Sequence, residues 1–250
     1  MHPFLHIISD PGKYSEKEEL YLAVRKAEGR ILTDEQVKQL PFVSPSPVFK
    51  KEWKIRSDSA SWLKKYITKN FHSPSVLELG CGNGWLSGYL SGIPGSTISG
   101  IDLNKEELLQ AAGLFGKKDI QFYYRDIFSD PLPANSFDII VLAASVQYFP
   151  SLKSLFSALF PLLKKNGEIH IIDSHFYHPR EVESAFKRSC DYYEKAGFPA
   201  MAKHYYHHSW EGLSGYHFSL LNRSAGQRLF SLFHPKSYLY FPWIKICPTP

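Results

Sequence analysis

Residues Val76–Trp85, which read VLELGCGNGW, decide the fold. A short apolar run stops at a glycine, two more glycines follow at alternate positions, and a segment with helical composition begins. Glycine has no Cβ atom and accepts positive φ, so this backbone can lie directly against a ligand. The first helical turn would add free N–H groups and a partial positive charge at the same place. The pattern predicts a buried strand, a ligand-binding loop and a helix.

The spacing of the glycines distinguishes two kinds of nucleotide ligand. The dinucleotide fingerprint G-x-G-x-x-G needs a glycine where this chain has Trp85 or Ser87. The chain instead reads E-x-G-x-G-x-G from Glu78. This carboxylate would repel a pyrophosphate, but it suits S-adenosylmethionine (SAM), which has an ammonium, a sulfonium and no phosphate. SAM is therefore favoured, and an NAD(P)-dependent oxidoreductase is the weaker alternative.

Downstream of the glycine loop, short apolar runs alternate with amphipathic segments. Strands are predicted at residues 76–80, 97–102, 120–127, 137–145 and 168–174. Helices are predicted at residues 84–92, 105–116 and 152–167, the last ending at Gly167. This alternation predicts a parallel sheet with helices on both faces. A further helix at 181–197 and an antiparallel strand pair within 207–221 and 237–246 are predicted to close the chain.

The N-terminal part has a different character. Helices are predicted at residues 16–28 and 33–40, the second capped by Thr33, and three prolines in 41–48 predict an extended linker. A helix capped by Ser57 or Ser59 would follow. We therefore divide the chain into an N-terminal helical extension with a Pro-rich linker, residues 1–56, and a second unit, residues 57–250.

Acidic residues end two further predicted strands. Asp102 ends the second strand, where a carboxylate can accept both ribose hydroxyls. Asp126 ends the third, where it can accept the adenine amine while Ile127 packs on the ring. Carboxyl ends of parallel strands share one edge of a sheet, so Glu78, Asp102 and Asp126 should surround one ligand. Residues 143–149 would face the sulfonium and the methyl acceptor.

The composition is that of a folded globular chain. The 250 residues include 44% hydrophobic and 21% charged side chains, with a net charge of +5, and fit one α/β domain with a modest extension. The basic residues form scattered pairs, which disfavours nucleic-acid binding. The 15 Tyr and 18 Phe predict a well-filled core or, alternatively, a pocket for a flat or apolar substrate.

Targeting and metal signals are absent from the sequence. The three cysteines have no CxxC spacing and predict neither disulfides nor zinc. The first residues do not resemble a signal peptide, and no apolar stretch approaches the roughly 20 residues of a bilayer span. The expectation is a soluble cytoplasmic protein without metal. A homodimer is left open.

These motifs together resemble those of the class I SAM-dependent methyltransferases. VLELGCGNGWLSGYL resembles the first motif of that family, GIDLN its acidic motif, RDIF its adenine-contacting motif and FDIIVLAASVQYF its fourth-strand motif. LLKKNGEIHIIDS resembles the entry to its fifth strand. The resemblance covers about residues 57–174. It looks most like the small-molecule branch that includes the ubiquinone and menaquinone biosynthesis type.

The resemblance implies a Rossmann-like three-layer α/β fold. Its sheet would have seven mostly parallel strands, with the last strand antiparallel and inserted between the fifth and sixth. It also implies SAM as cofactor and S-adenosylhomocysteine as product. The expected cofactor-binding residues are Glu78, Gly80, Cys81, Gly82, Asn83, Gly84, Asp102, Leu103, Asp126, Ile127, Ala143 and Gln147.

The sequence says less about the methyl acceptor than about the cofactor. Residues 1–56 and 176–250 match no substrate-recognition module of the family. The chain has no (D/N)-P-P-(Y/F) loop, no Pro-Cys loop and no paired-glutamate loop, which disfavours nucleic-acid and arginine methylation. A small-molecule acceptor is therefore favoured. A macromolecule-directed methyltransferase and an inactive SAM-binding module or partner subunit are the alternatives.

Methyl transfer needs a base only if the acceptor loses a proton in the transition state. Tyr148 and His175 are the candidate catalytic residues, with Tyr177 and His178 as further candidates. The cluster at residues 204–208, HYYHH, is either catalytic, metal-binding or a plain surface segment. The N-terminal helices form either a lid or a packing decoration.

Overall fold

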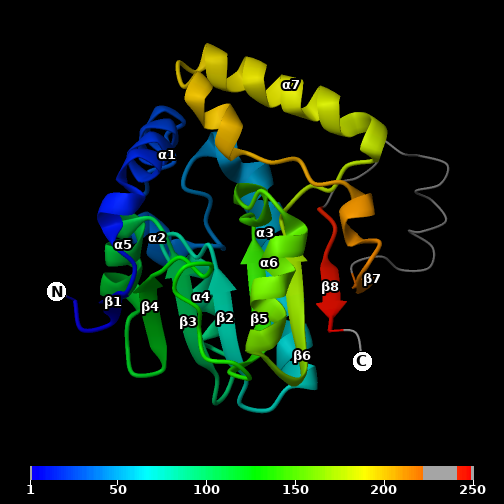
Figure 1. The fold of residues 1–250 in the computed structure, drawn as a ribbon. Helices are drawn as coiled ribbons and strands as arrows, with labels where there is room; N and C mark the ends of the chain where they lie inside the picture. The colour runs from blue at the N-terminus through cyan, green and yellow to red at the C-terminus, as the bar shows by residue number, and fades with distance from the viewer. Residues whose placement is uncertain (1, 222–240, 249–250) are drawn as a thin grey trace.

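The computed structural model describes residues 2–221 and 241–248. They form one sheet of eight strands in the order β1-β4-β3-β2-β5-β6-β8-β7, flanked by helices (Figure 1). The strands are β1 (Leu5–Ile7), β2 (Ser75–Leu79), β3 (Thr97–Asp102), β4 (Ile120–Tyr124), β5 (Phe137–Ala143), β6 (Leu163–Ile172), β7 (His217–Leu220) and β8 (Ile244–Cys247).

The first six strands pair in parallel, so their carboxyl ends share one edge of the sheet. The strand order runs outward from β2 through β3 and β4 on one side, and through β5 and β6 on the other. Leu77 of β2 lies opposite Ser99 of β3 and Ile140 of β5. An open α/β sheet binds its ligands at the carboxyl edge where the strand order reverses. Here that point lies beside β2.

Helices cover both faces of the sheet. One face packs against α3 (Lys50–Asn70), α4 (Trp85–Leu90) and α5 (Lys105–Phe115), and the other against α6 (Leu152–Leu159). Successive side chains of a strand point to opposite faces, so Val76 joins the first hydrophobic core and Leu77 the second. Both residues are fully buried, which explains the continuous apolar run of β2.

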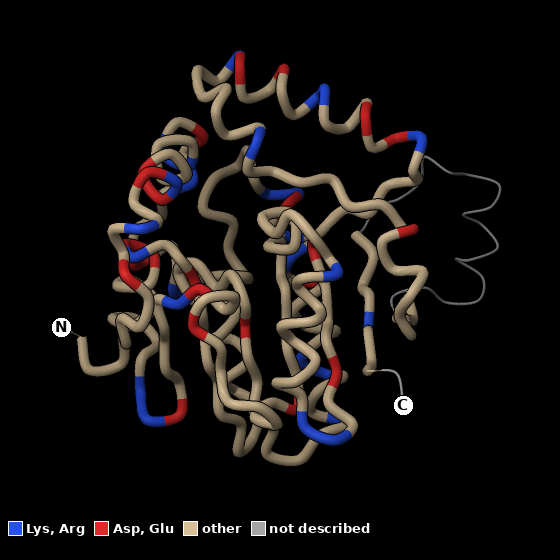
Figure 2. The backbone as a smooth tube through the Cα atoms, in the orientation of Figure 1, with Lys and Arg blue, Asp and Glu red and all other residues tan. Residues whose placement is uncertain are grey.

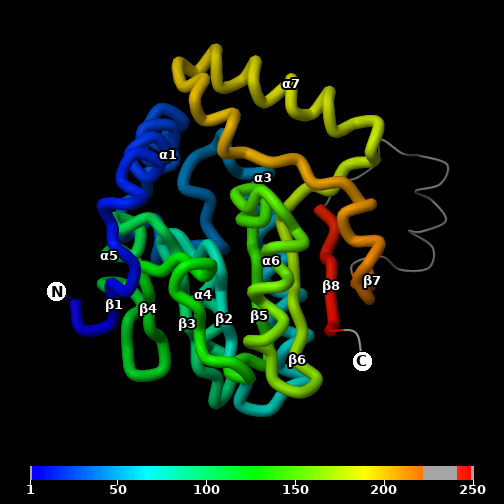
Figure 3. Tube along the Cα trace, viewed as in Figure 1, coloured from blue at the N-terminus to red at the C-terminus, as the bar shows by residue number. Residues whose placement is uncertain are grey.

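Two more helices stand over the carboxyl edge. These are α1 (Ser15–Ala27) and α7 (Pro179–Lys195), and the chain that leaves α7 runs back across the strand ends (Figures 1 and 3). The helix α2 (Asp34–Gln39) begins at the predicted cap, Thr33, whose side chain accepts from the Gln36 backbone N–H. The carboxyl edge of the sheet, where a ligand was expected, is therefore covered by α1 and by α7 with the segment that follows it.

The predicted fold class is confirmed, with one more strand than expected. Among the seven strands from β4 to β7, the last strand, β8, lies antiparallel between β6 and β7 as expected. The additional strand, β1, pairs in parallel with β4, with Leu5 opposite Phe122. It lies in a region predicted as helical only. A three-residue strand is too short to show a readable sequence period.

Several predicted boundaries are wrong. The helix predicted at residues 152–167 ends at Leu159, because Pro161 has no N–H to continue it. A 3-10 turn follows, and β6 already begins at Leu163. The prolines at 41–48 do not make a fully extended linker, because Pro47–Phe49 forms a 3-10 helix.

The start of α3 is also corrected. Neither Ser57 nor Ser59 caps this helix, which begins at Lys50 and crosses the expected division between residues 56 and 57. The hydroxyl of Ser59 instead donates to Asp173 over 2.7 Å. The strand expected within 237–246 includes residues 237–240, which lie outside the described residues, and its remainder contains the start of β8.

Charge is mixed over the fold. In Figure 2, the Lys and Arg positions are interspersed with the Asp and Glu positions along the backbone tube. None of the helices in the part of the chain that the structure describes combines the length and the apolar character needed to cross a bilayer.

Candidate active site

The glycine loop joins β2 to α4 at the carboxyl edge. Gly80 has a φ of 78°, and a Cβ atom on it would lie 2.5 Å from the Cβ of Ser145. A side chain cannot fit there, so the approach requires glycine. Ser145, just after β5, donates to the Leu79 carbonyl over 2.7 Å. This hydrogen bond holds the two predicted ligand loops side by side.

Asp102, the last residue of β3, holds the glycine loop in place through hydrogen bonds. Its carboxylate accepts the backbone N–H of Gly82 at 2.8 Å and that of Leu103 at 2.7 Å. Burial raises the pKa of Asp102, while these hydrogen bonds oppose the rise. The end of β3 and the glycine loop therefore form one unit.

Asp126 lies two residues beyond β4. It accepts hydrogen bonds from the hydroxyls of Tyr14 and Ser129 and from the Phe128 backbone N–H. Burial acts to raise the pKa of Asp126, but these hydrogen bonds hold it below its ordinary value. Tyr14 directly precedes α1, so this hydrogen bond ties α1 to the strand ends.

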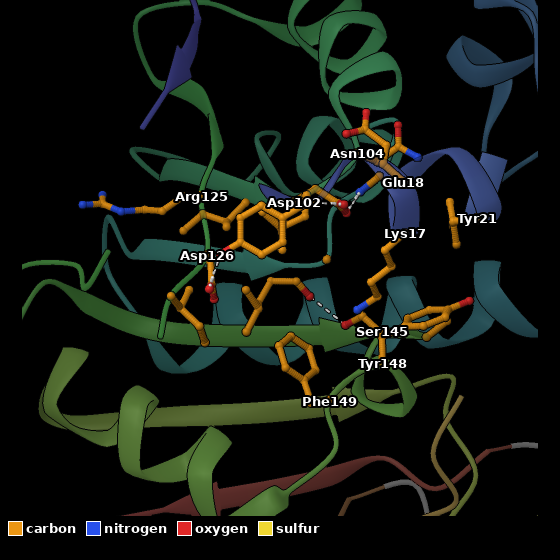
Figure 4. Close-up of a pocket in the computed structure, with 18 of the residues that line it drawn as sticks. Lys17, Glu18, Tyr21, Asp102, Asn104, Arg125, Asp126, Ser145, Tyr148 and Phe149 are labelled. Carbon is orange, nitrogen blue, oxygen red and sulfur yellow. Dashed lines mark hydrogen bonds between the residues drawn. The ribbon is translucent and has the colours of Figure 1, made fainter. Parts of the chain in front are cut away.

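A first cavity lies between Asp102 and Asp126 (Figure 4). Lys17 extends into it from α1, and burial lowers the pKa of that ammonium despite the two nearby carboxylates. Apolar walls between carboxylates suit a flat base joined to a polar sugar. The lining is Tyr14, Lys17, Glu18, Tyr21, Leu79, Gly80, Gly82, Ile101, Asp102, Leu103, Asn104, Arg125, Asp126, Ile127, Ala144, Ser145, Tyr148, Phe149 and Met201.

A second cavity, of about 350 Å³, continues from the first and shares Gly80, Gly82 and Tyr148 with it. It is more polar and is walled by arginines, glutamates and aromatic rings. Its other lining residues are Tyr21, Val24, Arg25, Glu28, Arg30, Leu32, Glu52, Trp53, Arg56, Glu78, Cys81, Asn83, Trp85, Glu107, Ala143, Ala144, Gln147, Ser189, Tyr192, Tyr193, Met201 and Tyr205.

Two carboxyl groups of the second cavity titrate near neutrality. Glu78 is 2% exposed and accepts the Ser87 hydroxyl at 2.6 Å. Burial raises the pKa of Glu78 to about 8 despite this hydrogen bond. Burial likewise raises the pKa of Glu107, on α5, to about 7. A cation beside either group would favour its ionised form.

Tyr148, a predicted catalytic residue, lines both cavities. Its ring meets those of Tyr21 and Tyr205 edge-on, at centroid distances of 5.8 and 5.9 Å. Burial raises the pKa of Tyr148 above its ordinary value of 10. The hydroxyl is therefore protonated at neutral pH and can donate a hydrogen bond, but it is a poor base.

The other predicted catalytic residue, His175, lines neither cavity. Its ring packs against Tyr177 at 5.8 Å and Phe241 at 4.6 Å. The chain bends at Asp173, which has a φ of 54°, so following β6 directly does not bring His175 to the cavity wall. The prediction relied on sequence adjacency to the strand end and could not anticipate this bend.

The further candidates Tyr177 and His178 also line neither cavity, and the predicted cofactor-binding residues divide between the two cavities with one exception. Gly84, with a φ of 74°, lines neither; it caps α4, and a Cβ there would lie 2.7 Å from that of Ala111. Within the cluster 204–208, Tyr205 reaches the second cavity and His208 is buried against the Val146 carbonyl. The described residues contain no group of three or more His, Cys, Asp or Glu that could hold a metal.

Sequence reasoning missed the contribution of α1. Tyr14, Lys17, Tyr21 and Arg25 all line the cavities. They recur at intervals of three and four residues, so they occupy one face of the helical segment. This polar and aromatic stripe was visible in the sequence, but nothing local showed that it would lie over the glycine loop.

The fold is shared with solved methyltransferases. The chain resembles geranyl diphosphate C-methyltransferase from Streptomyces coelicolor A3(2), solved with Mg²⁺, geranyl-S-thiolodiphosphate and S-adenosyl-L-homocysteine, at a TM-score of 0.57 and 14% identity over 94% of this chain and 96% of that one. It also resembles the YcgJ protein of Bacillus subtilis, at a TM-score of 0.57 and 17% identity. That match covers 78% of this chain and 100% of the other. This chain has the class I SAM-dependent methyltransferase fold.

The sequence comparisons place the family within that class. Residues 77–171 match the methyltransferase domain family. Sterol 24-C-methyltransferase of Pneumocystis carinii is 31% identical over 97 residues, 37% of this chain and 26% of that protein. Malonyl-[acyl-carrier protein] O-methyltransferase of Bacillus anthracis is 32% identical over 93 residues, 37% and 34%. The chain thus matches about a quarter to a third of the length of these relatives, and the match to the methyltransferase domain family lies within residues 77–171.

Proposed function

We propose that this chain is an active methyltransferase that takes a methyl group from SAM and delivers it to a small-molecule acceptor. The observation that carries the proposal is the meeting of Asp102, Asp126 and the glycine loop around the first cavity, with the second cavity adjoining it. The first cavity suits the adenosine part. The second adjoins the glycine loop and offers space for the methionine part and an acceptor.

Each group has a defined task in this proposal. Asp102 accepts the ribose hydroxyls, Asp126 the adenine amine, and Glu78 faces the methionine ammonium. When bound, SAM supplies an activated methyl group on its sulfonium, so the protein contributes position and electrostatics. Tyr148 donates a hydrogen bond at the acceptor side. Glu107 takes a proton if the acceptor must lose one, since its pKa of about 7 suits a general base.

A small acceptor and an active site are supported by separate observations. The relatives named above include enzymes of sterols and of geranyl diphosphate, which are small molecules. An inactive SAM-binding module would fill the acceptor space, whereas here an aromatic-lined cavity adjoins the glycine loop. A macromolecule-directed enzyme usually concentrates its basic residues, whereas the basic residues of this sequence form scattered pairs.

Calorimetric titration with SAM, S-adenosylhomocysteine and NADH tests the cofactor. We expect micromolar binding of the first two and none of NADH. Asp102→Ala should weaken SAM binding roughly 10- to 100-fold, because hydrogen bonds to a charged group contribute about 1.5–3 kcal/mol. Asp119→Ala, at an exposed carboxylate outside both cavities, is the matched control. Preference for NADH would refute the proposal.

A further inference from the structure

Three arginines line the second cavity, and two of them are already paired. Arg30 donates to both carboxylate oxygens of Glu52 at 2.9 and 2.7 Å and lies 3.2 Å from Glu28. Arg56 lies 3.0 Å from Glu52. These four side chains neutralise one another. The third arginine, Arg25, comes from the α1 stripe and stands outside this network.

The guanidinium of Arg25 has no polar partner among the described residues. Its Nε atom is buried without a hydrogen bond, and its nearest defined contact is the Tyr21 ring, 5.7 Å away. Burial acts to lower the pKa of Arg25, but nearby Tyr21 and Glu107 raise it on balance, so the group stays charged. Arg25 is half-buried, and a charge that is partly removed from water without a hydrogen-bonded partner is costly.

The surrounding carboxyl groups do not compensate this charge. Glu107, with a pKa of about 7, is partly protonated at neutral pH. Glu28 is shared between Arg30 and the hydroxyl of Tyr192. The second cavity therefore contains one positive group whose hydrogen-bond donors are free for a ligand.

We propose that Arg25 binds a carboxylate that a small molecule brings into the second cavity. A guanidinium matches a carboxylate with two parallel N–H donors. The proposal rests on the proposed function, because the cavity adjoins the glycine loop. The carboxylate comes from one of two sources: the methionine part of SAM, or an acceptor that is an aromatic acid held between the rings of Tyr21, Tyr148 and Tyr205.

The first arm of the test removes the carboxylate from the cofactor. Calorimetry gives the Kd of SAM, of decarboxylated SAM, which lacks only the carboxylate, and of 5′-methylthioadenosine, which lacks the whole amino acid. If Arg25 binds the cofactor, the wild-type protein prefers SAM over decarboxylated SAM roughly 10- to 100-fold. Arg25→Met should abolish this preference and leave methylthioadenosine binding unchanged, which also shows that the variant is folded.

The second arm supplies the carboxylate separately. The protein is saturated with S-adenosylhomocysteine and titrated with benzoate and with its neutral analogue benzamide. If Arg25 binds the acceptor, benzoate binds roughly tenfold or more tightly than benzamide, and Arg25→Met removes the difference. Arg25→Lys keeps the charge without the two-donor geometry and should retain part of the preference in either arm.

The controls distinguish a failure of the role proposed for Arg25 from a failure of the proposed function. Lys26→Met removes an exposed positive charge one residue away and should change neither preference. Unchanged preferences in Arg25→Met, in both arms, would overturn the role of Arg25 while SAM binding persists. Failure of the wild-type protein to bind SAM and methylthioadenosine would instead overturn the proposed function.

Discussion

The carboxyl groups around the glycine loop differ in pKa because their surroundings differ. Asp126 accepts three hydrogen bonds and its pKa is lowered. Glu78 accepts the Ser87 hydroxyl, is 2% exposed, and has a pKa of about 8. Desolvation penalises the charged form, and only hydrogen bonds or cations offset it. The site therefore combines a fixed negative charge with groups whose charge depends on the ligand.

This difference predicts that SAM binds more weakly at low pH. Glu78 is protonated below about pH 8 in the free protein and must lose its proton to face an ammonium. The affinity for SAM should therefore rise between pH 6 and pH 8, by up to roughly tenfold per pH unit, and level off above pH 8. Calorimetry at a series of pH values, in buffers of different ionisation enthalpy, would measure both the affinity and the released proton.

Two variants test whether Glu78 causes the pH dependence of SAM binding. Glu78→Gln copies the protonated form and should flatten the pH profile, whereas Glu107→Gln should leave the part between pH 7 and pH 8 largely in place, since Glu107 titrates near pH 7. Methylthioadenosine, without an ammonium, should bind independently of pH. An unaltered SAM profile in Glu78→Gln would mean that another group releases the proton.

Among the helices and strands, α1 is the one whose stability we expect to depend most on a ligand in the site. Val24 is its only buried residue, so α1 contributes little to the core. Its contacts with the loop after β4 and with α5 are polar: Tyr14 precedes α1 and donates to Asp126, and Glu18 accepts the Lys105 backbone N–H. Segments with few buried apolar contacts open at low free-energy cost. The helix should therefore be stabilised when its other face contacts a ligand.

Hydrogen exchange measured by mass spectrometry tests this dependence. Saturation with S-adenosylhomocysteine should slow exchange in α1 at least roughly tenfold, because opening the helix would then also break ligand contacts. Exchange in α6 serves as the internal control. This helix packs on the face of the sheet opposite to α3, α4 and α5, and it lines neither cavity. Equal changes in α1 and α6 would indicate general stabilisation, and no change in α1 would exclude it as a lid.

The elements also show what the sequence could predict. The strands from β2 to β6 have local signals, because each contains a short apolar run and all but β5 end near a glycine or an acid, and their existence was predicted. The acids at 102 and 126 reach one cavity because parallel strands align their ends. Arg25 and His175 depend on where a distant helix lies and on how the chain bends at Asp173. Such positions follow from tertiary packing, which no sequence period encodes.

At the scale of the molecule, the first 56 residues are part of the same fold. The helix α3 runs through residues 56 and 57, and its Trp53 is buried against Trp85 of α4 at 5.3 Å, ring to ring. Leu5 and Val37 belong to the same core cluster. The division proposed from composition falls inside a helix, so its two parts share one hydrophobic core.

A fragment of residues 57–250 should therefore not fold as the full chain does. It lacks β1 and the first two turns of α3, and it exposes the surface that Trp53 covers. Loss of a buried tryptophan alone costs about 3–5 kcal/mol, a large share of the 5–15 kcal/mol that stabilises a typical domain. Thermal unfolding followed by circular dichroism should show a broad or absent transition, with Trp53→Ala in the full chain intermediate. A sharp transition at the temperature of the full chain would show that the fragment is independent.

The pairing of β1 with β4 also bears on how the protein is synthesised. Leu5 leaves the ribosome 117 positions before its partner Phe122, an interval of roughly ten seconds at ordinary translation rates. During that interval β1 has no sheet edge to join, and α1, which follows it in the chain, has no strand ends to cover. The site is therefore completed only after β4 has been made, and the segment that contains β1 must stay unpaired until then.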